Sequence, residues 1–107
     1  MSTAPVAQIL NFNEMVTYQE GSIVSRQITI NETGNITLFA FDAGQGLSEH
    51  TAPFNALVQM LEGSAEIFIS GKSFMLEAGQ SIIMPAGQPH ALKAVVRFKM
   101  LLTMIRS

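Results

Sequence analysis

Apolar and polar side chains alternate over short stretches along most of the chain, and small turn-forming residues separate these stretches. From residue 23 onward the stretches are rich in β-branched and aromatic residues, and they recur at short, regular intervals. This pattern is typical of the strands of a sandwich or barrel. No long segment has the 3.6-residue period of an amphipathic helix. We expect strands at residues 23–30, 36–41, 56–61, 65–69, 73–76, 81–84, 90–95 and 98–105.

The first twenty residues are less regular. We expect a short strand at residues 8–12 and one helical turn at residues 13–18, for which Asn13 is a suitable N-cap. Residues 1–5 are mostly small, and we expect them to be loosely ordered. A series of eight or nine short strands within 107 residues predicts one all-β domain, a jelly roll or related barrel, spanning residues 1–107.

The composition predicts that part of the surface is covered. Apolar residues make up 48% of the chain and charged residues 13%, which is roughly half the usual charged share. The expected strand at residues 98–105 is apolar on both faces, which does not suit a solvated edge strand. Surfaces of this kind are often buried against a partner, so we expect a homodimer.

Charge and cysteine content exclude several classes of function. The net charge is −2, and the six Lys and Arg residues are scattered, so we expect no nucleic-acid partner. The chain has no cysteine, which excludes disulfides and Cys-ligated zinc. No apolar run approaches 18 residues, and the first residues lack the pattern of a signal peptide, so we expect no membrane partner and a cytoplasmic protein.

The most specific pattern in the chain begins at Gly79. Pro85, Gly87 and His90 follow it at spacings that match G-x5-P-x-G-x2-H-x3-N, although Ala94 stands at the final Asn position. This stretch resembles the second motif of the cupins. The resemblance implies a cupin-type double-stranded β-helix, which is a jelly-roll barrel.

The first cupin motif, G-x5-H-x-H-x3,4-E-x6-G, is only partly present. Gly44, His50 and Gly63 match it, whereas Ala52 stands at the second His position and Ala56 at the Glu position. The two motifs together cover residues 44–94. The glycines and Pro85 fit tight turns at the ends of strands.

The resemblance also implies a site inside the barrel. In metal-binding cupins three His and one Glu hold a divalent metal such as Mn, Fe, Ni or Zn, and only His50 and His90 retain such roles here. Non-haem iron takes two His and a carboxylate, and catalytic zinc takes three protein ligands, so a metal would need a third ligand from elsewhere. We therefore favour a pocket without metal, with a two-His metal site as the alternative.

The inward-facing residues near the two histidines predict a pocket, and three classes of function stay open. The first is a small-molecule-binding barrel, and the second is a divalent-metal-dependent dioxygenase, isomerase or decarboxylase that uses His50 and His90 plus an unidentified third ligand. The third is a protein without a ligand whose barrel serves only assembly. Methionines fill irregular gaps well, and they suit either a core or an adaptable pocket. The residues that we expect to line the pocket are His50, His90, Ala52, Ala56, Val58, Met60 and Met84.

Overall fold

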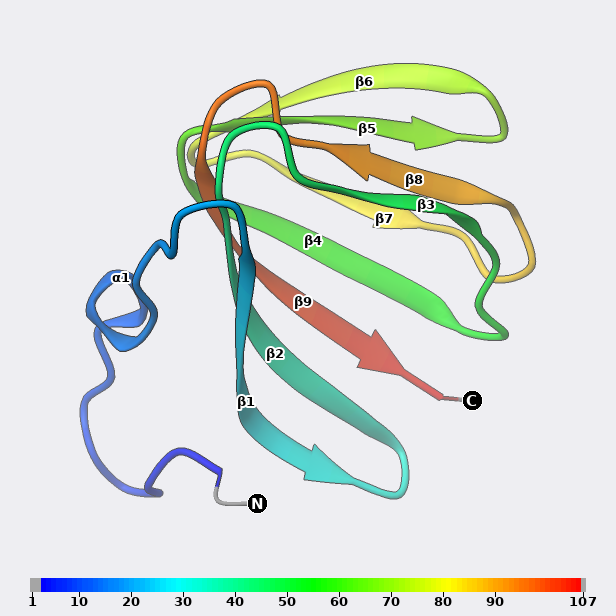
Figure 1. The fold of residues 1–107 in the computed structure, drawn as a ribbon. Coiled ribbons are helices and arrows are strands. Elements are labelled where there is room, and N and C mark those ends of the chain that lie inside the picture. The colour runs from blue at the N-terminus through cyan, green and yellow to red at the C-terminus, as the bar shows by residue number, and fades with distance from the viewer. Residues whose placement is uncertain (1–2, 107) are drawn as a thin grey trace.

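The computed structural model describes residues 3–106, and within them it forms nine strands and one short helix (Figure 1). The expected all-β class is therefore confirmed. The elements in chain order are α1 (Phe12–Met15), β1 (Ile23–Asn31), β2 (Gly34–Phe41), β3 (Gly46–His50), β4 (Asn55–Glu62), β5 (Ser64–Ile69), β6 (Lys72–Glu77), β7 (Ser81–Met84), β8 (His90–Lys93) and β9 (Phe98–Ile105).

The strands form two antiparallel sheets that face each other as in a jelly roll. The larger sheet has the order β1-β2-β9-β4-β7, and the smaller has the order β3-β8-β5-β6 (Figure 1). The last strand, β9, lies in the middle of the larger sheet between β2 and β4, where both of its edges are paired. The predicted jelly-roll architecture is thus confirmed.

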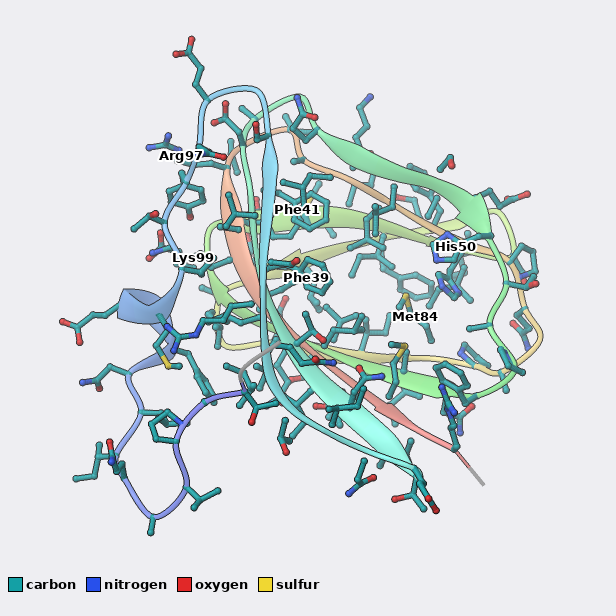
Figure 2. The ribbon with its side chains drawn as sticks, turned by 60° about the horizontal axis from the view of Figure 1, so that its bottom comes forward. Phe39, Phe41, His50, Met84, Arg97 and Lys99 are labelled. Atoms are coloured by element: carbon teal, nitrogen blue, oxygen red, sulfur yellow. The ribbon has the colours of Figure 1, made fainter. Side chains whose placement is uncertain are left out.

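Alternate residues of each strand point between the sheets and form the main core. Phe41 and Phe98 stack there with their ring centroids 4.6 Å apart, and both side chains are completely buried. Ile67 of β5 is also fully buried in this core. Figure 2 shows Phe41 and Phe39 inside the barrel, between Arg97 and Lys99 on the side of the N-terminal segment and His50 and Met84 on the opposite side.

A second apolar cluster covers the outer face of the larger sheet. The N-terminal segment, residues 3–22, packs Ala4, Val16 and nearby apolar side chains against Leu38 and Leu101. The N-terminal segment therefore covers Leu101 on the outer face of β9, whereas Ile105 at the end of the same face is 65% exposed.

The N-terminal segment also differs locally from the expectation. The strand predicted at residues 8–12 does not form, and the helical turn is Phe12–Met15, so Asn11 rather than Asn13 is the N-cap residue. Residues 1 and 2 of the segment expected to be loose lie outside the described residues. Ala4 is buried and donates its N–H to the carbonyl of Ile28 at 2.9 Å, so this part is packed against β1.

Polar groups fasten the N-terminal segment to the sheet. The buried Lys99 Nζ of β9 donates a 2.6 Å hydrogen bond to the carbonyl oxygen of Asn13. Tyr18 OH donates to Glu62 Oε2 at 2.6 Å, and Arg97 stacks on the Tyr18 ring with 4.2 Å between the guanidinium carbon and the ring centroid. These contacts join the segment to β4 and to the start of β9.

Candidate ligand pocket between the sheets

A cavity of about 160 Å³ lies between the two sheets, at the end of the barrel where β3 and β8 pair (Figure 2). Its walls are almost entirely apolar, and the two histidines of the chain supply the polar side chains. The lining residues are Leu47, His50, Ala52, Ala56, Met84, His90, Leu92, Met100, Leu102 and Met104.

Five of the seven residues that we expected in the pocket lie on this cavity: His50, His90, Ala52, Ala56 and Met84. The expectation for the other two, Val58 and Met60, differs from the structure. They point inward from β4 as Ala56 does, but they lie further along the strand, towards Phe98, and are buried in the core with exposures of 0% and 2%. The cavity is confined to the end of the barrel where β4 begins.

The two histidines face each other across the pairing of β3 and β8. His50 and His90 are register partners, and their Nε2 atoms are 3.1 Å apart with the rings edge to face. His90 is only 4% exposed, whereas His50 is exposed on one side. His50 therefore stands at the mouth of the cavity, and His90 is part of its inner wall.

Hydrogen bonds determine which nitrogens carry hydrogen in the neutral pair. The Ser48 carbonyl can only accept, so His50 Nδ1, 2.7 Å away, must donate to it. His50 Nε2 is then an acceptor, and His90 Nε2 donates to it. His90 Nδ1 is left as a buried nitrogen without a hydrogen-bond partner of good geometry among the described residues.

The surroundings of His90 keep it neutral. Burial lowers the pKa of His90 below its ordinary value, and the proximity of His50 lowers this pKa further. A contact with the Gln88 backbone acts in the opposite direction and is the smaller effect. At neutral pH His90 is therefore neutral, and in the neutral pair its Nε2–H is a donor beside the acceptor Nε2 of His50.

The residues present do not fit the metal site that the cupin resemblance implies. Among residues 3–106 no group of three or more His, Cys, Asp or Glu side chains is placed to hold an ion. Ala52 and Ala56, at two of the four ligand positions, lie on the cavity wall and provide no donor. Two imidazoles fall short of the three protein ligands of a catalytic zinc or non-haem iron site.

The turn residues of the two motifs have distinct structural roles. Gly44, Gly63, Gly79 and Gly87 all have positive φ angles, between 76° and 88°, which glycine adopts without strain. Gly63 has an additional constraint, because a Cβ there would lie 2.2 Å from the Arg97 carbonyl oxygen. Pro85 directly follows β7, where its missing N–H interrupts no strand pairing.

Sequence reasoning missed half of the lining. Leu102 and Met104 belong to the expected strand at residues 98–105, which is apolar on both faces, so nothing in the pattern distinguished pocket from core positions. Leu47 lies on β3, a strand that the pattern did not predict. The lining residues absent from the expectation are Leu47, Leu92, Met100, Leu102 and Met104.

Comparison with known proteins agrees with the fold and the motif pattern. The sequence profile of the cupin domain matches residues 37–105, so the chain belongs to the cupin family. No curated protein matches the chain.

Solved structures give the same result. A conserved protein of unknown function from Streptococcus pyogenes is 36% identical, with a TM-score of 0.92, over 100% of this chain and 96% of that one. A cupin 2 conserved barrel domain protein from Leptotrichia buccalis is 38% identical, with a TM-score of 0.88, over 91% of this chain and 47% of that one. A cupin superfamily protein from Desulfitobacterium hafniense has a TM-score of 0.91 at 24% identity, over 99% and 97% of the two chains, and shows the fold alone.

The described residues include no helix that is long and apolar enough to cross a membrane.

Proposed function

We propose that the protein is a binding protein for a small, mostly apolar molecule that carries one hydroxyl group. The observation that supports this proposal is the apolar cavity whose polar wall is the His50–His90 pair. A hydroxyl group both donates and accepts. It can therefore replace the contact between the two Nε2 atoms by donating to His50 and accepting from His90.

The size and polarity of the cavity limit the ligand further. A cavity of about 160 Å³ is close to the roughly 150 Å³ apolar cavity that binds benzene in an engineered protein. The ligand is therefore expected to be of single-ring size. An anion is disfavoured, because it would lose its hydration in an apolar cavity whose inner histidine is held neutral.

Phenol and benzene form a matched pair of probes for this proposal. They differ by one hydroxyl group, and a hydrogen bond contributes about 0.5–1.5 kcal/mol, so phenol should bind up to about tenfold more tightly. Binding is measured by ligand-observed NMR on protein kept in a metal chelator. His50→Ala should remove the preference for phenol, and Ala56→Leu, which fills the cavity, should remove binding of both probes.

Ala78→Leu is the control, because Ala78 lies in the exposed turn before β7 and does not line the cavity. Binding that survives Ala56→Leu, or the absence of binding by either probe at its solubility limit, would contradict the proposal.

We also infer a homodimer, now through a different surface. Leu57 and Ile83 are neighbours on β4 and edge strand β7, and the N-terminal cluster does not include them. Ile83 is 59% exposed. Light scattering on Ile83→Lys should show a monomer if this edge of the sheet forms the interface. The expected cytoplasmic location stays a prediction.

A further inference from the structure

Both histidines of the chain and three of its seven methionines line the same cavity of about 160 Å³. Met84, Met100 and Met104 come from β7 and β9 of the larger sheet. The histidines come from β3 and β8 of the smaller sheet. Thioether and imidazole groups therefore approach one space from opposite walls.

The strand register brings two of the thioethers to one place. Ala56 of β4 is paired with Met84 on one side and with Met104 on the other, so the three residues form one row across the sheet. The two methionine Cα atoms are about two strand spacings apart, roughly 10 Å. Only the methyl group of Ala56 lies between them, and long, flexible methionine side chains can converge over it.

The histidine pair is also suitable for binding an ion. His50 donates through Nδ1 to the Ser48 carbonyl, which leaves its Nε2 lone pair directed at His90. With the Nε2 atoms 3.1 Å apart, an ion about 2.0–2.1 Å from both would see them at an angle of roughly 100°. Such an angle occurs in tetrahedral sites.

We propose that this cavity binds monovalent copper, Cu(I), through His50 and His90 together with the thioethers of Met84 and Met104. Thioether ligands are soft and favour Cu(I), whereas carboxylate ligands, which suit harder ions, are missing from the wall. The donor set for a hard metal is incomplete, because Ala56 occupies the position of the motif's Glu. Met84 and Met104 are the register partners of Ala56, so two thioethers flank that position.

Charge supports a monovalent ion independently of ligand softness. No acidic side chain lines the cavity, so an ion would enter it without a compensating negative charge. The free energy of transferring an ion into an apolar medium grows with the square of its charge, so a divalent ion would be opposed about four times more strongly.

The hydrogen between the two histidines must move when the ion binds. In the empty neutral pair it lies on His90 Nε2, which donates to His50. Binding of Cu(I) would place it on His90 Nδ1, which has no hydrogen-bond partner of good geometry among the described residues and lies next to the Gln88 backbone. The hydrogen thus moves within His90, and the Nε2 atoms of both histidines are free to bind the ion.

This inference uses the same cavity as the proposed function but does not require an organic ligand. The test titrates reduced, oxygen-free protein with Cu(I) against the chromophoric chelator bicinchoninate. We expect one Cu(I) per chain, and copper X-ray absorption should show sulfur as well as nitrogen neighbours. Zn(II) titrated in parallel should bind more weakly.

Paired variants identify the ligands. Met84→Leu with Met104→Leu removes both thioethers at nearly constant volume and should weaken Cu(I) binding by more than about tenfold, since loss of even an outer-shell partner weakens metal binding 10–100-fold. It should leave Zn(II) binding unchanged. His50→Ala should also weaken Cu(I) binding. Met60→Leu is the matched control, because Met60 is as buried as Met84 but lies outside the lining.

Cu(I) binding that is equal in the double variant and the wild type, or X-ray absorption without sulfur neighbours, would overturn the proposal. Phenol binding by the double variant separates the two hypotheses. If the variant binds phenol but not Cu(I), the organic-ligand site and the thioether site are both supported. If the wild type binds Cu(I) but not phenol, only the proposed function fails.

Discussion

Replacing Gly63 by alanine should destabilise the domain far more than the same change at Gly79. Both glycines have positive φ angles, 76° and 88°, so both changes force alanine into the left-handed region at a free-energy cost of about 1–2 kcal/mol. Of these two positions, only Gly63 would place the new methyl group in a steric clash with the rest of the chain. An ideal Cβ there lies 2.2 Å from the Arg97 carbonyl oxygen and 2.9 Å from Phe98 Cα, whereas nothing lies within 4 Å at Gly79.

The atoms that Gly63 approaches are backbone atoms of Arg97 and Phe98 and the Phe98 Cβ, whose position the backbone fixes, so no side-chain rotation can make room. Overpacking of a well-packed site is destabilising by about 1–3 kcal/mol, which brings the expected total for Gly63→Ala to roughly 3–4 kcal/mol. A difference of about 2 kcal/mol between the variants corresponds to roughly 10 °C in the melting temperature of a domain of this size.

Urea and thermal unfolding followed by circular dichroism measure both variants. If the Gly63→Ala protein fails to fold while the Gly79→Ala protein folds, the prediction that Gly63→Ala is the more destabilising change is also supported. Equal losses of stability in the two variants would refute the steric argument, because backbone conformation alone would then account for both.

Three further predictions concern titration and packing. The chain has a single tyrosine, and burial, together with the hydrogen bond to Glu62, raises the pKa of Tyr18. Phenolate absorbance should therefore appear only well above pH 10, and unfolding stability should fall as pH rises past about 10, since the unfolded state loses the proton first. Burial and His50 lower the pKa of His90, so the contribution of neutral His90 to the free energy of unfolding should be fully present above about pH 6.5. This contribution should decline at lower pH, where the unfolded state binds the proton first. Melting temperatures measured across this range for wild type and His90→Gln check this, and an equal decline in both would contradict it. Phe98→Ala removes a fully buried stacked ring and should lower the free energy of unfolding by about 3–5 kcal/mol in a urea titration. A loss below about 1 kcal/mol would contradict this, because it would mean that the core closes over the space left by the ring.

Most strands followed from the alternation of residue types, and the exception has a physical reason. Strand β3, Gly46–His50, contains one apolar residue, Leu47, and its pairing with β8 is irregular between Leu47 and His50. A strand at the rim of a cavity has little to bury, so its sequence lacks alternation. Residues 8–12 show the reverse case: their pattern resembled a strand, but they cross the outer face of the larger sheet without pairing in it.

The site could be predicted as far as the motif spacing reached. The positions of His50 and His90 in the two motifs were sufficient to anticipate that they share one space. The extent of that space could not be predicted, because it depends on side chains from distant strands. Phe41 of β2 and Phe98 of β9 fill the part of the interior that the cavity does not reach, and Met60 belongs to the same core cluster.

The central position of β9 has a consequence for biosynthesis. β9 is synthesised after β2 and β4, yet it is the strand that lies between them in the larger sheet. Lys99 of β9 also anchors the N-terminal segment through Asn13. A nascent chain that lacks β9 therefore exposes two unpaired strand edges and an uncovered apolar face, which favour aggregation. The larger sheet can assemble only once translation of β9 is complete, so chains that stall before residue 98 are expected to depend on chaperones or to be degraded.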